Sequence, residues 1–191
     1  MKTIKITLTM KTIKITFLSL LSSLLFISCE KDDKSPELIQ EEELITSVIV
    51  TLNSSEGQVV LSSKDLDGDG PNVPVISVVG ALKQNTIYNG TIQLLNESVS
   101  PSEDITIEVK EEAEEHQFFY DFNTIIKRIE ATDVDKNNNP LGIQFELETG
   151  AIGSANIGFT LRHLPTKPNT GITTAGGETD IAVTFEVSVV E

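Results

Sequence analysis

The sequence has no tryptophan, one cysteine, two histidines and about half as many basic as acidic residues. A single cysteine, Cys29, excludes an intramolecular disulfide. The sequence has 14 basic and 29 acidic residues, so its formal net charge is -15 and its surface repels nucleic acid. The fold must therefore be stabilised by packing, or by packing together with bound ions. We expect a protein or a glycan as the partner, and no nucleic acid.

Long hydrophobic runs are absent except for one, residues 17–29, with the sequence FLSLLSSLLFISC. It is shorter than the roughly 20 apolar residues that a membrane-spanning helix needs. Lysines precede it and charged residues follow it, as in a secretory signal. Residues 26–29 resemble the lipobox of bacterial lipoproteins, where a small residue, here Ser28, precedes the cysteine that receives a diacylglyceryl group. The resemblance implies a signal peptide at residues 1–28 and a lipid bilayer anchor at Cys29.

The beginning of this predicted signal is duplicated. Residues 1–8, MKTIKITL, recur as MKTIKITF at residues 10–17. The copy occurs once and inside the signal, so it does not indicate a repeat fold. We expect Met10 to be the working start, because a signal that begins there has an ordinary length.

Residues 29–43 are predicted to be an acylated cysteine followed by a charged, flexible tether, because they contain too few apolar groups to fold. Lys31-Asp32-Asp33 resembles the signal that sends Bacteroidetes lipoproteins to the outer face of the outer membrane. It implies surface exposure, and a plain spacer on a periplasm-facing lipoprotein is the alternative. Without the four lysines of the signal, 10 basic residues remain against 29 acidic ones, a formal charge of -19.

From residue 44 onward, apolar and polar residues alternate with period two. This alternation is typical of antiparallel strands with one buried face. Turn residues such as Asn89-Gly90 and Gly176-Gly177 separate the alternating segments. The sequence therefore predicts one all-β domain over residues 44–191, an antiparallel, immunoglobulin-like β-sandwich of about eight to ten strands. The segments are 44–52, 58–62, 73–79, 86–95, 105–110, 116–122, 143–148, 155–162 and 181–189.

Two loops carry carboxylates at alternating positions. Asp65, Asp67 and Asp69, followed by Gly70 at the sixth position, match the first half of an EF-hand calcium loop. Its twelfth position is Ile76 rather than a bidentate glutamate. These three aspartates are a candidate Ca²⁺ site.

The second loop is a weaker copy of the first, with Asp133, Asp135 and Asn137 as its candidate Ca²⁺ ligands. The alternative for both loops is a hairpin in which Asp and Asn cap the backbone of a tight turn.

Two histidines, His116 and His163, fall in phase with inward-facing residues. With Glu178 and Asp180 they contain the donor atoms of a transition-metal site. No His-x-His or His-x-x-x-His spacing supports that reading, so we favour partly buried, hydrogen-bonded histidines. The acidic cluster before His116 is expected to be a solvated face. It consists of Glu108, Glu111, Glu112, Glu114 and Glu115.

No nucleophile elbow, phosphate loop or dinucleotide fingerprint occurs, so the sequence predicts no catalysis. Five segments of the sequence are distinctive, namely residues 65–72, 114–119, 160–163, 167–169 and 176–181. Together they resemble an uncharacterised family of small flavobacterial lipoproteins. That family implies a location and no established activity. Its members often carry the label of a type 1 periplasmic-binding fold, a longer, two-lobed α/β architecture that this strand pattern does not match.

These observations predict an outer-membrane lipoprotein with a non-catalytic β-sandwich for adhesion or accessory binding, stabilised by calcium if the first loop binds it. The alternative is a solute-binding component that delivers a ligand to a transporter.

Overall fold

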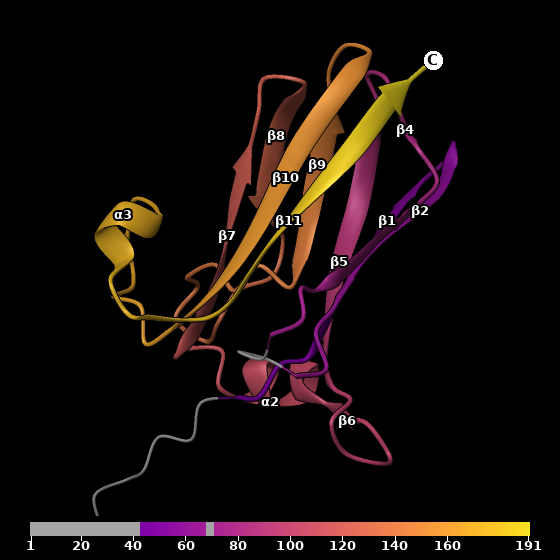
Figure 1. Cartoon of the computed structure of the whole chain (residues 1–191). Coiled ribbons are helices and arrows are strands. Elements are labelled where there is room, and N and C mark those ends of the chain that lie inside the picture. The colour runs from indigo at the N-terminus through magenta and orange to yellow at the C-terminus, as the bar shows by residue number, and fades with distance from the viewer. Residues whose placement is uncertain (1–42, 68–70) are drawn as a thin grey trace, which may run out of the picture. The chain divides into compact units, whose positions relative to one another are not determined.

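The computed structural model describes residues 43–67 and 71–191 (Figure 1). This part of the chain has eleven strands and two short helices. The strands are β1 Ser47–Ser54, β2 Gly57–Lys64, β3 Val75–Val79, β4 Leu82–Lys83, β5 Ile87–Asn96, β6 Glu103–Asp104, β7 His116–Phe122, β8 Ile126–Ala131, β9 Gln144–Thr149, β10 Gly153–His163 and β11 Glu178–Val190. The helices are α2 Ile105–Glu111 and α3 Ile172–Ala175.

The strands form two sheets. Sheet A has the order β3-β2-β1-β5-β9-β8, with β6 paired to β5, and sheet B has the order β4-β11-β10-β7. Neighbouring strands are antiparallel, except that β4 runs parallel to β11. The predicted all-β, antiparallel sandwich is confirmed. Two of the eleven strands, β4 and β6, have only two residues each.

The core lies between the sheets because alternation sends every second side chain inward. In β5, for example, Tyr88, Ile92 and Leu94 are buried. Phe145 of sheet A packs against Phe159 of sheet B with ring centroids 5.6 Å apart. Each such buried phenylalanine contributes about 1.5–3 kcal/mol of transfer free energy.

The predicted strand over residues 105–110 is wrong, because this segment is helix α2. Asp104 caps the helix, since its side chain accepts a hydrogen bond from the backbone N–H of Thr106 at 3.1 Å. Ile105 and Val109 are buried one turn apart, while Ile107 between them is exposed. The local cap and the i, i+4 spacing decide the structure, although the segment also alternates.

Strand β3 is the terminal strand of sheet A. It lies where the sequence predicts a strand, and Val78 packs against the core, but the other three apolar side chains of β3 face solvent. Val75 is 70% exposed, Val79 is 64% exposed and Ile76 is 47% exposed. Within the described ranges β3 pairs with β2 alone, so its outer edge has no partner strand.

Three strand ends meet at one end of sheet B. Strand β7 begins there, β10 ends there and β11 begins there, because His163 pairs in register with both His116 and Glu178. Helix α2 lies at this same end, and the chain enters the sandwich beside it, ahead of β1 (Figure 1). This end of the molecule gathers the side chains of the candidate site.

Candidate metal centre

The two histidines of the sequence stack on each other. His116 is the first residue of β7, His163 is the last residue of β10, and the antiparallel register places them directly opposite. Their ring centroids are 4.9 Å apart and the rings are 9° from parallel. Both are buried, and the side chain of His116 has no exposed surface. The register therefore joins two residues that are 47 positions apart in the sequence.

Two carboxylates complete the group. Glu43, which precedes β1, places Oε1 2.9 Å from Nε2 of His116. Asp180 of β11 places Oδ2 3.8 Å from the same nitrogen. The side chains of Glu43 and Asp180 are only 3% and 2% exposed. Glu43, His116 and His163 each offer one ligand atom, and these atoms all lie within 4.8 Å of one another.

The hydrogen bonds of His116 orient its two ring nitrogens. Nδ1 lies 3.2 Å from the backbone carbonyl of Glu112, an acceptor, so Nδ1 carries the proton and donates it. Nε2 makes no hydrogen bond, because Glu43 approaches it at ion-pair distance but outside hydrogen-bonding geometry. Oε2 of Glu43 is also buried without a hydrogen bond. Buried polar atoms without partners are rare in native proteins, so these two need an explanation.

The surroundings of the histidines are acidic. Glu115 places Oε2 3.9 Å from Nε2 of His163. On α2, burial raises the pKa of Glu108, and the nearby carboxylate of Glu43 raises it further. The carboxyl-terminal end of α2 also faces this region, and helix ends of this polarity favour cations. All five residues of the acidic cluster are exposed, as the sequence predicts, and the cluster lies next to the buried histidines.

Lys167 holds the backbone of residues 113–116 in place next to this site. Its Nζ donates hydrogen bonds to the carbonyl oxygens of Ala113 and His116 and lies 3.5 Å from Oδ2 of Asp135. The side chain is 5% exposed, and burial lowers the pKa of its ammonium group. Lys167 therefore holds the turn that leads into His116, and its charge is matched by Asp135.

Glu178 belongs, with Asp180, to the metal-site alternative that the sequence analysis did not favour. It is exposed and lies outside the group, although it pairs in register with His163. Glu43 takes its place. The sequence prediction put Glu43 at the end of the tether, because the acidic run there resembles a solvated segment. The only signal that could have identified it is its position next to the first alternating strand.

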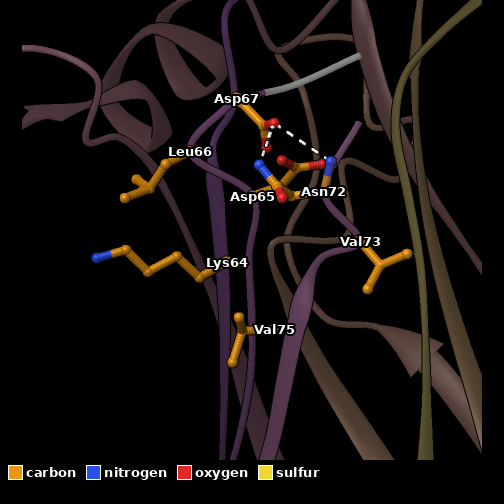
Figure 2. A pocket seen from close by; sticks show the side chains of 7 residues that line it. All are labelled: Lys64, Asp65, Leu66, Asp67, Asn72, Val73 and Val75. Carbon is orange, nitrogen blue, oxygen red and sulfur yellow. Dashed lines mark hydrogen bonds between the residues drawn. The ribbon is translucent and has the colours of Figure 1, made fainter. Parts of the chain in front are cut away.

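The first predicted calcium loop lies after β2 and is drawn in Figure 2. Asp67 accepts hydrogen bonds from the backbone and side-chain N–H groups of Asn72, at 3.3 and 2.7 Å. The side-chain bond from Asn72 is the main cause that lowers the pKa of Asp67. Oδ1 of Asp65 is buried without a hydrogen bond beside them. Asp69 lies outside the described residues, so calcium at this loop stays a prediction.

The second predicted calcium loop joins β8 to β9. Oδ1 of Asp135 accepts from the backbone N–H groups of Asn137 and Asn139, and Oδ2 faces the side chains of Asn139 and Lys167. Asp133 accepts from the backbone N–H of Gly142 at 2.8 Å. These contacts favour the hairpin alternative, because a cation at Asp135 would have to displace a lysine.

Cys29 and the predicted signal and tether lie outside the described residues, apart from Glu43. Within the described ranges, no helix is long and apolar enough to cross a membrane. No protein-family model, curated protein or solved structure matches this chain.

Proposed function

We propose that this chain is an exported lipoprotein, anchored in the outer membrane through Cys29, whose β-sandwich is a non-catalytic domain for adhesion or accessory binding. The observation that carries the proposal is the short spacing between the lipobox-like cysteine and the folded domain. Among the residues that the structure describes, Glu43 is the first, its side chain is buried, and it follows Cys29 by fourteen residues. Such a spacing suits a domain that a short tether holds close to the membrane surface.

Display on the outer face is the favoured location. Lys31-Asp32-Asp33 follows the predicted acylation site directly, and the resemblance to small flavobacterial lipoproteins points the same way. The formal charge of -19 for residues 29–191 disfavours contact of the domain itself with anionic lipid. The bilayer contact is therefore assigned to the acyl chains alone.

A pocket beside β7 favours the second candidate, capture of a solute for a transporter. It has a volume of about 440 Å³, which lies in the range of small-molecule sites. Phe119 and Tyr120 of β7 line it together with Ile129 of β8, so an aromatic surface is available for a ring-shaped ligand. Equilibrium dialysis against pooled mono- and oligosaccharides, with Phe119→Ala as the variant, distinguishes the two. Binding that the variant loses supports solute capture.

The anchor is tested by metabolic labelling with radioactive palmitate in a bacterium that processes lipoproteins. We expect labelled protein from the native chain and none from Cys29→Ser. Incorporation into Cys29→Ser, or none into the native chain, would overturn the proposal.

Surface display is tested by protease treatment of intact cells. We expect the domain to be cleaved in the native chain and protected in Asp32→Asn with Asp33→Asn. Glu41→Gln with Glu42→Gln removes the same charge further along the tether and serves as the matched control. Protection of the native chain would place the domain on the periplasmic side.

A further inference from the structure

We propose that Glu43, His116 and His163, together with Asp180, bind one divalent transition-metal ion, with Zn²⁺ as the best match. The proposal does not depend on lipid anchoring, since every ligand belongs to the folded domain. Its basis is the convergence of four buried ionisable side chains from four separate segments. These are the segment before β1, β7, β10 and β11.

The charge of the group calls for a cation. The side chain of Glu43 is almost fully buried and its Oε2 has no hydrogen bond, and burial of an uncompensated carboxylate is costly. The ammonium group of Lys167 is buried, but its contacts are with Asp135 and with the backbone carbonyls of Ala113 and His116. Beside Glu43, that compensation can come from a protonated imidazole or from one divalent ion. Two carboxylates, two neutral imidazoles and one divalent ion sum to zero charge, with no proton required.

The donor geometry of His116 is that of a metal ligand. A ligating histidine characteristically donates its other ring N–H to a backbone carbonyl or a carboxylate, which fixes the tautomer. Nδ1 of His116 does so with Glu112, and Nε2 is directed toward Glu43 without a hydrogen bond of its own. An ion between Nε2 and Oε2 of Glu43 would satisfy both buried atoms that lack partners.

The donor types select the metal. Two imidazoles with carboxylate oxygens suit zinc, copper or nickel, whereas calcium prefers six to eight oxygen ligands. Zinc bonds of about 2.0–2.1 Å require ligand atoms about 3.3 Å apart. The ligand atoms of Glu43, His116 and His163 lie up to 4.8 Å apart, so these side chains must move closer together around the ion. Four protein ligands leave no open position, which is the arrangement of structural rather than catalytic zinc.

The ligands come from both layers of the sandwich. Glu43 leads directly into β1 of sheet A, while the histidines and Asp180 belong to sheet B. The ion would therefore tie the entry of the chain to the opposite sheet. Metal binding should raise the stability of the whole domain.

The test uses residues 29–191 with Cys29→Ser, so that no thiol competes for metal. This range contains every core residue in the described part of the chain. Isothermal titration with ZnCl₂ after treatment with a chelator should give one equivalent bound. Zinc at 100 times Kd should raise Tm by roughly 5–10 °C. An X-ray absorption spectrum of the zinc complex should show two imidazoles in the shell.

Glu43→Gln and His163→Gln should each lower the zinc affinity at least about tenfold while circular dichroism stays native. Glu178→Gln removes an exposed carboxylate at the same end of sheet B and is the matched control, with an expected change under twofold. The proposal is overturned by no stoichiometric zinc binding, by a shell made only of oxygen, or by unchanged affinity in both folded ligand variants. The lipidation experiment has a separate readout, so failure of one proposal does not affect the other.

Discussion

The ring of Phe145 on β9 lies over Gly90, its register partner on β5. A Cβ atom on Gly90 would fall inside van der Waals contact with several ring atoms. The aromatic ring fills the space that a side chain on the glycine would take, and it packs on to Tyr120 and Phe159 of sheet B. Gly90 therefore decides where the central aromatic cluster sits.

Gly90→Ala should reduce the free energy of unfolding by about 2–3 kcal/mol, because overpacking displaces the Phe145 ring. Urea unfolding followed by tyrosine fluorescence measures the change. Gly158→Ala on β10 is the matched control, since a Cβ there meets its neighbours at ordinary contact distance, 3.4 Å or more. A loss in the control equal to that in Gly90→Ala would contradict the explanation.

Lys167→Met should destabilise the domain by about 3–5 kcal/mol, because it leaves the carboxylate of Asp135 buried without its cation. The second change Asp135→Asn should recover part of that loss in a double-mutant cycle. Lys136→Met removes an exposed lysine that pairs with Glu114, and it should leave the free energy of unfolding almost unchanged because surface ion pairs contribute little. Additive effects of Lys167 and Asp135 would show that the two groups do not interact.

Asp104→Ala should cost about 1 kcal/mol by removing the cap of α2. The hydrogen bond from Thr106 is the main cause that lowers the pKa of Asp104 below its ordinary value. The contribution of the carboxylate is therefore complete above the unfolded-state pKa of about 3.9 and is lost as the pH falls through the folded-state pKa.

Urea titrations at pH 7 and at pH 2.5 test this pH dependence. The difference between native protein and Asp104→Ala should shrink at the lower pH, while Glu103→Ala beside it should show a smaller difference at pH 7. If the difference in unfolding free energy between native protein and Asp104→Ala is the same at both pH values, the effect comes from helix propensity and not from the charged cap.

Calcium at the first loop is testable by thermal unfolding. With a Kd near 0.1 mM, as in extracellular modules, 1 mM CaCl₂ should raise Tm by about 3–6 °C. The rise should vanish in Asp67→Ala with Asp69→Ala and persist in Asp133→Ala. If millimolar calcium does not raise the Tm of the native protein, this loop is a hairpin with capping Asp and Asn residues, like the second loop.

Most strands were predictable because one face of each is buried, so that apolar and polar residues alternate along the strand. The segments 155–162 and 181–189 show this directly, and they form β10 and β11. Strand β8, Ile126–Ala131, escaped prediction because its burial recurs every third residue at Ile126 and Ile129. Helix α2 was misread because its alternation is accidental and its cap, Asp104, is a common turn residue as well.

The histidine site was beyond the reach of sequence spacing. His116 and His163 meet only because β7 and β10 pair in one particular register, and a shift by one residue would separate them. Single-sequence patterns locate strands but not their partners. Glu43 joins the site through the path of the chain into β1, which no local pattern encodes.

The uncovered flank of β3 has a practical consequence for handling the protein. A row of unpaired peptide groups with Val75, Ile76 and Val79 beside it is a template on which a second chain can add a strand. Mutual repulsion between strongly acidic molecules opposes that encounter in dilute buffer. Salt at 1 M shortens the electrostatic screening length to about 3 Å. Concentrated solutions of the protein should therefore stay monodisperse at low ionic strength and begin to oligomerise in 1 M salt.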